Sequence, residues 1–200
     1  DLAAIAIGFN IWLPLYPVVL GVMFASSAII AQDFGAGRIH RIRDHLPQAL
    51  WVSVFLSLIV APLCYFSHLG LGWLGIDGQT AEKSSEYIKM VAFGFPALGI
   101  FMALRYHCQG VGITSPFAVA AVVGFIANIP LNFMFIFGFG DIPAMGAQGC
   151  GIATAISMWL SAIVITVYVL QKKSLKQYMP PWSPVAPNAN TIKEILVLGS

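Results

Sequence analysis

Gly124-Phe-Ile-Ala-Asn128-Ile-Pro130-Leu-Asn132 is the stretch that decides the fold, because it places two carboxamides and a proline inside an apolar run long enough to cross a bilayer. Asn128 and Asn132 are four residues apart, so on a helix both amides lie on one face. Pro130 has no N–H and leaves the carbonyl of Ile126 without its helical partner, which favours a local bend. The segment therefore offers several polar oxygens at the depth of the membrane core.

Two interpretations of this polar face remain open. An unpartnered amide in lipid is costly, so both Asn side chains must face another helix or a hydrated cavity. In the first interpretation they only hold helices together, as polar residues often do in membrane bundles. In the second they line a cavity that receives a guest, and the extra backbone oxygen released by Pro130 favours this one.

The composition indicates an integral membrane protein. The chain has 200 residues, of which 58% are hydrophobic and only 9% are charged, whereas soluble domains carry about 25% charged residues. A net charge of +2 is too small to indicate a nucleic-acid partner. The three cysteines lie in or beside apolar runs without paired spacing, which indicates neither a disulfide framework nor a zinc site.

Apolar runs recur along the chain, each long enough to span a bilayer at a helical rise of about 1.5 Å per residue. Pro14 and Pro17 predict a bend or irregular entry in the first run, or its termination at the interface. Pro47 is expected in the first turn of the second. The sequence therefore predicts an all-α integral membrane bundle of five complete transmembrane helices, at residues 11–31, 47–66, 87–104, 117–139 and 149–170.

The connections between these runs alternate in charge. Those at residues 38–43, 105–107 and 172–176 are basic, whereas those at 68–85 and around Asp141 are acidic. Basic loops favour the cytoplasmic side of the membrane. This rule places the Asp1 end on the outer side.

The domain organisation follows from a proline-rich stretch near the end of the chain. Residues 179–190 predict a semi-rigid cytoplasmic linker. It separates an amino-terminal transmembrane lobe, residues 1–178, from the start of a further transmembrane helix at residues 191–200. We expect the chain to be a fragment of a longer protein, because no basic leader precedes Asp1 and the last apolar run is incomplete.

Chemistry inside the predicted spans is limited. No carboxylate lies deep within them, and neither an Asp pair nor a His-Glu zinc spacing is present, which argues against an intramembrane protease. We therefore expect that the protein is not an enzyme and has no catalytic residue, bound metal or cofactor. Thr154 either approaches Asn128 and Asn132 from a neighbouring span or bonds the carbonyl four residues before it. Tyr87 is either an interfacial aromatic residue or a hydroxyl that lines a cavity.

Five segments resemble the amino-terminal lobe of the multidrug and toxic-compound extrusion (MATE) transporters, NorM-type. They are Asp1-Leu-Ala-Ala-Ile-Ala-Ile-Gly, Ile11-Trp-Leu-Pro, Ala31-Gln-Asp-Phe-Gly-Ala-Gly-Arg, Asn128-Ile-Pro-Leu-Asn-Phe-Met-Phe-Ile-Phe-Gly and Pro143-Ala-Met-Gly-Ala-Gln-Gly-Cys-Gly-Ile-Ala-Thr-Ala-Ile. The resemblance implies that the five spans are helices two to six of a twelve-helix transporter in the bacterial inner membrane. It also implies antiport, in which an organic, often cationic, drug is exchanged for inward Na⁺ or H⁺.

The resemblance carries roles to particular residues. It makes Asn128 and Asn132 the cation-site pair, Thr154 their hydroxyl partner and Tyr87 a residue of the substrate cavity. Asn132 stands where some branches have Asp, so this helix alone cannot bind and release a proton there. The family's essential Asp on the first helix lies upstream of Asp1, so only neutral oxygens remain, although hard cations usually need an anionic ligand as well.

The implied partners are a drug substrate, membrane lipid, and the first helix and carboxy-terminal lobe of the same protein. Two other functions stay open. One is a lipid-linked precursor flippase of a related fold, which would need a more basic cavity. The other is a structural membrane subunit that transports nothing.

Overall fold

The computed structural model describes residues 1–76, 78–180 and 186–199. Within these residues the only β pairing is an isolated bridge between Phe139 and Ile142, which confirms the all-α class. The helices are α1 (Leu2–Trp12), α2 (Leu15–Gly35), α3 (Ile39–Phe66), α4 (Gly78–Ala92), α5 (Phe95–Gly110), α6 (Ser115–Phe137), α7 (Gly146–Gln171) and α8 (Ala189–Gly199), with short 3₁₀ helices η1 (Ser67–Gly70), η2 (Gly72–Leu74) and η3 (Lys173–Tyr178).

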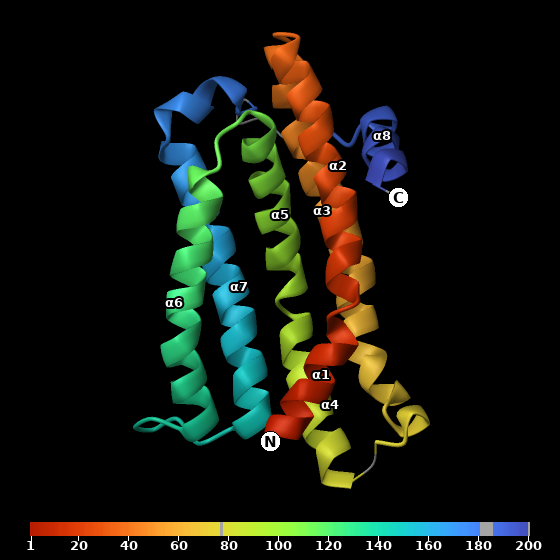
Figure 1. The fold of residues 1–200 in the computed structure, drawn as a ribbon, viewed down its shortest axis with the longest axis vertical. Helices are drawn as coiled ribbons and strands as arrows, with labels where there is room; N and C mark the ends of the chain where they lie inside the picture. The colour runs from red at the N-terminus through yellow and green to blue at the C-terminus, as the bar shows by residue number, and fades with distance from the viewer. Residues whose placement is uncertain (77, 181–185, 200) are drawn as a thin grey trace.

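The helices form an elongated bundle of membrane-spanning length. Four helical stretches of the described chain are long and apolar enough to cross a membrane, or five if the bent pair α4–α5 is one span. In Figure 1, α6 and α7 lie together at one side, α2 and α3 at the other, and α5 between them. The turn between α2 and α3, the connection between α5 and α6, and η3 all lie at the same end. The three basic connections therefore share one end of the bundle.

Helix α5 is the central element. Most of its residues are buried, among them Phe95, Met102 and Cys108, which are at most 1% exposed. A helix that is apolar on all sides is stable only when other elements cover it, and α5 contacts α2, α3, α6 and α7. The bundle is thus organised around this helix.

Prolines interrupt the first span. Pro14 lies in the break between α1 and α2, and the helix continues on both sides, so the predicted irregular entry is confirmed. The chain upstream of Ile11 is helical as well, and the first spanning stretch extends over Leu2–Gly35. Termination at Pro14 was the alternative, and it is wrong.

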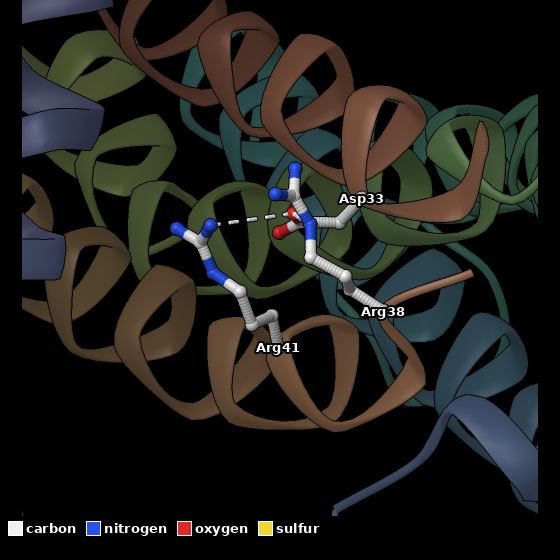
Figure 2. A network of polar contacts seen from close by, with 3 residues as sticks. All are labelled: Asp33, Arg38 and Arg41. Carbon is white, nitrogen blue, oxygen red and sulfur yellow. Dashed lines mark ion pairs between the residues drawn. The ribbon is translucent and has the colours of Figure 1, made fainter. Parts of the chain in front are cut away.

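The predicted start of the second span at Pro47 is also wrong. Helix α3 begins at Ile39 and Pro47 lies inside it. Asp33, which is 3% exposed, explains the difference: its Oδ1 lies 2.8 Å from Arg38 Nε and 3.5 Å from Arg41 Nη1 (Figure 2). These ion pairs hold the polar first turn of α3 against the end of α2, so the segment is a helix instead of a loop.

Asp33→Ala is expected to lower the free energy of unfolding by about 1–3 kcal/mol, because two arginines lose their buried anionic partner while staying half in solvent. Asp44→Ala is the matched control, since Asp44 is exposed on α3, the helix that carries Arg41. Thermal denaturation of purified protein, followed by size-exclusion chromatography, measures both variants. Equal melting temperatures would show that the ion pairs do not stabilise this turn.

The third predicted span is a bent pair of helices. Helix α4 begins at Gly78, and it meets α5 at an angle of 44° across residues 93–94. Pro96 has no N–H for the carbonyl of Ala92, so a continuous helix loses a hydrogen bond here. Trp159 of α7 donates from Nε1 to the Phe93 carbonyl at 3.0 Å. This hydrogen bond stabilises the break between α4 and α5.

The other limits are close to those predicted. Helix α6 covers Ser115–Phe137 and α7 covers Gly146–Gln171. Helix α8 begins at Ala189, two residues before the predicted start. Linker residues 181–185 lie outside the described part of the chain.

The described flanks of this linker are held by α3. Gln48, which is 3% exposed, donates from Nε2 to the Ala186 carbonyl at 3.2 Å and accepts from the Asn188 N–H at 2.7 Å. Arg43 Nε donates to the Gln177 carbonyl at 2.7 Å. The chain on both sides of residues 181–185 is therefore tied to the same helix.

Candidate functional site: a polar chain and a cavity between α6 and α7

Helices α6 and α7 approach closely because small residues line their contact. A Cβ on Gly124 would overlap Ser161, and one on Gly149 would overlap the Phe135 carbonyl. On the other side of α7, a Cβ on Gly151 would lie 2.6 Å from the Tyr87 carbonyl oxygen of α4. Such contacts are typical of membrane helices whose backbones meet. They bring the first turns of α7 between α4 and α6.

This packing aligns a chain of hydrogen bonds. Asn132 Nδ2 donates to Asn128 Oδ1 at 2.7 Å, and Asn128 Nδ2 donates to Ser157 Oγ at 3.1 Å. Ser157 Oγ in turn donates to the Ala153 carbonyl at 2.8 Å. The two amides share one helix face, as their spacing predicts, and they connect α6 to α7.

This chain of hydrogen bonds ends at the side-chain oxygen of Asn132. Asn132 Oδ1 is buried and has no hydrogen-bond partner among the described residues. A buried polar atom in this condition costs about 1–3 kcal/mol. The oxygen can therefore be stabilised by a donor or a cation that approaches from outside this set of residues.

Thr154 makes the hydrogen bond within its own helix that was one of its two alternatives, and its role beside Asn128 and Asn132 stays a prediction. Its Oγ1 donates to the Cys150 carbonyl of its own helix at 2.9 Å, and the same residue lines a cavity together with Asn128. The hydroxyl oxygen still has acceptor capacity, because the bond to Cys150 uses only its proton.

The cavity has a volume of about 350 Å³ and lies among α2, α5, α6 and α7. Most of its wall is apolar or aromatic, and the polar groups come mainly from α6 and α7. Its lining residues are Tyr16, Leu98, Phe101, Arg105, Phe117, Ala121, Asn128, Thr154, Ser157, Met158 and Ser161. A hollow of this kind with a few polar groups fits an amphipathic small molecule.

Tyr87 and Asn132 do not belong to this wall. Tyr87 is 3% exposed, and its hydroxyl accepts a hydrogen bond from Trp12 Nε1 at 3.2 Å. It lies on α4 and packs against Gly8 of α1 and Gly151 of α7, and its proposed place in the substrate cavity stays a prediction. Pro130 lies inside a continuous α6, and its function as a bend also stays a prediction.

Two residues of the site were missed from the sequence. Ser157 is three residues after Thr154 and therefore shares its face of α7, a spacing that could have revealed it. Arg105 was assigned to a basic loop, although it lies within α5 and lines the cavity. Sequence alone gave no signal for that position, because the end of a spanning helix and a loop have the same composition.

Comparison with known proteins identifies the family of this chain. The family model MatE matches residues 1–134. Over its full length the chain is 34% identical to the multidrug resistance protein MdtK of Photorhabdus laumondii subsp. laumondii and 32% identical to the probable multidrug resistance protein NorM of Acinetobacter baylyi. It covers 44% of each of these proteins, so it spans less than half the length of the relatives that it matches.

Solved structures agree in fold. The crystal structure of the eukaryotic MATE transporter AtDTX14 superposes with a TM-score of 0.86 at 19% identity, covering 99% of this chain and 43% of that one. A crystal structure of MATE in the bent conformation gives a TM-score of 0.87 at 23% identity, with 99% and 43% covered. The match to the family model, which covers more than half of the chain, shows that the chain belongs to the multidrug and toxic-compound extrusion (MATE) family.

Proposed function

We propose that these residues form the amino-terminal lobe of a multidrug efflux transporter that exchanges organic compounds for Na⁺ or H⁺ across a bacterial inner membrane. The observation that carries the proposal is the chain from Asn132 through Asn128 to Ser157, with its unpaired acceptor beside an amphipathic cavity. Family members are secondary transporters and not enzymes. The names of the bacterial relatives describe multidrug resistance, which supports drugs as the substrate class.

The coupling ion would be held by neutral oxygens of this lobe. Asn132 Oδ1 and Thr154 Oγ1 have free acceptor capacity, and oxygen donors are the ligands that hard cations prefer. An anionic ligand is needed in addition, and we propose that it comes from a helix upstream of Asp1. In this arrangement, occupancy of the site biases the rocking of one lobe against the other, and Pro130 provides the bend in α6.

The placement in the membrane is part of the same proposal. The shared end of the three basic connections (Figure 1) would face the cytoplasm, which leaves the Asp1 end outside. Residues 179–190 would be the linker between lobes, and α8 the start of the seventh helix of a twelve-helix protein. The five spans would then be helices two to six.

Ethidium efflux tests the function in cells that lack their own drug pumps and express the complete transporter containing this chain. We expect efflux that depends on an imposed Na⁺ or proton gradient, and we expect Asn132→Ala to slow it about fivefold, because the ion loses an oxygen ligand. Asn10→Ala is the matched control, since Asn10 is exposed and its side chain donates to the Ala6 carbonyl of its own helix at 2.9 Å. Gradient-dependent efflux that is unimpaired in both Asn132→Ala and Asn128→Ala would exclude the cation site.

A further inference from the structure

Among the described residues that line the cavity between α6 and α7, Arg105 is the one with a formal charge. Its guanidinium carbon lies 4.1 Å from the ring centroid of Phe117 and 5.1 Å from that of Tyr106. These rings fix the plane of the guanidinium by cation–π stacking. The positive charge is therefore positioned, and it belongs to the wall of the cavity.

This charge has no anionic partner among the described residues. The described ion pairs involve other cations, and the buried Nε of Arg105 has no hydrogen-bond partner there. Its Nη1 contacts only the weak acceptor Met102 Sδ, at 3.9 Å. A partly desolvated cation in this condition is stabilised by an incoming anion and repels an incoming cation.

The geometry of a guanidinium selects the kind of anion. Its planar set of N–H donors forms paired hydrogen bonds with a carboxylate, which a single neutral acceptor cannot match. Beside it, the rings of Phe101 and Phe117 lie 5.9 Å apart. A carboxylate attached to an aromatic ring would therefore meet both its charge partner and a stacking surface.

The polar groups of the cavity are well separated. Phe117, next to Arg105, and Asn128 are eleven residues apart on α6, which corresponds to about 16 Å along the helix axis. The amides and hydroxyls near Asn128 can accept or donate hydrogen bonds but bring no charge. An elongated ligand would thus place its anionic end at Arg105 and an uncharged or weakly basic part at Asn128.

We propose that Arg105 is a specificity-determining residue, which receives the carboxylate of aromatic acids and zwitterions at one end of this cavity. The inference rests on the proposed transport function and narrows its substrate class. A compound whose only charge is positive gains nothing from Arg105. Such a compound binds in this cavity without the guanidinium, or against its repulsion.

A pair of rhodamine dyes tests this assignment, one with a free benzoate and the other its methyl ester. The dyes share the same cationic aromatic system and differ in one negative charge. Their binding to the purified complete transporter is measured by fluorescence anisotropy, which requires no ion gradient. Arg105→Gln is expected to raise the Kd of the acid fivefold to tenfold, about the value of one charge-assisted pair, and to leave that of the ester unchanged or lower.

Two further variants separate charge from structure. Arg105→Lys keeps the charge without the planar donors, so we expect it to recover part of the affinity for the acid. Lys173→Gln removes an equal charge from an exposed position outside the cavity, and we expect it to change neither Kd.

The remaining outcomes are also decisive. Equal weakening of both dyes by Arg105→Gln would overturn the assignment, because it would indicate a structural residue. An unchanged Kd for the acid, or a wild-type protein that binds only the ester, would overturn it as well and leave the proposed transport intact. A wild-type protein that neither binds nor exports either dye would reject the transport proposal together with this inference.

Discussion

Gly149→Ala is expected to prevent the assembly of the bundle, although the change adds a single methyl group. The new Cβ would overlap the carbonyl carbon and oxygen of Phe135, which are backbone atoms and cannot rotate away. That carbonyl is itself fixed, because it accepts a hydrogen bond from the Met145 N–H at 2.9 Å. With alanine at position 149, α7 could pack on α6 only if the two helices moved farther apart. We expect a loss of at least about 3 kcal/mol in the free energy of unfolding, at the upper end for overpacking.

Gly35→Ala provides the matched control for the same chemical change. Gly35 also lies in a helix and is exposed, and no atom lies within 4 Å of the position that its added methyl group would occupy. Alanine favours helices over glycine by about 1 kcal/mol at most, so this variant should be neutral or slightly more stable. Heating followed by fluorescence size-exclusion chromatography compares the two. Similar melting temperatures would show that the close approach of α6 and α7 is not required for folding.

The number and order of the spans could be predicted because apolar length and charged connections are local properties of the sequence. The start of α3 could not, since its polar first turn looks like a loop until Asp33 is paired with Arg38 and Arg41 (Figure 2). Polar helix ends that project beyond the apolar core carry no hydropathy signal. The same reason explains why the start of α4 at Gly78 was missed.

The break between α4 and α5 depends on a contact that is remote in sequence. Pro96 weakens the helix, but prolines are tolerated inside other helices of this chain, as Pro130 is in α6. Here Trp159 supplies a donor to the Phe93 carbonyl across 66 residues. Nothing in the local pattern around Pro96 indicates that partner.

The candidate site, too, could be predicted only in part from the sequence. The common face of Asn128 and Asn132 follows from their spacing, and the structure has them hydrogen-bonded to each other. The spacing does not show which helix the two amides face. The hydrogen bond from Asn128 to Ser157 depends on how α6 packs on α7. Counting charges in the connections assigned Arg105 to a loop. Such a count contains no information on which side of α5 faces the cavity.

A double variant, Asn128→Leu with Ser157→Ala, distinguishes the two interpretations of the polar chain. Losing one partner leaves a buried amide or hydroxyl unpaired and costs about 1–3 kcal/mol, whereas losing both removes the need for the hydrogen bond. Leucine is close in shape to asparagine, but it cannot accept the hydrogen bond of Asn132 Nδ2, so the double variant should stay folded and lose about 1–3 kcal/mol for the one amide left unpaired. If the pair only holds α6 to α7, drug efflux should survive as well.

We expect stability and transport to separate in that double variant. Asn128 lines the cavity and positions Asn132, so its replacement removes one amide from the cavity and releases the other. Efflux of ethidium by the complete transporter should fall at least about twentyfold, within the usual range of coupling between sites. Thr166→Val serves as the control, because Thr166 bonds the Ala162 carbonyl on α7 at 2.6 Å and lies outside this cavity. Efflux by the double variant that matches Thr166→Val would mean that the amides serve helix packing alone.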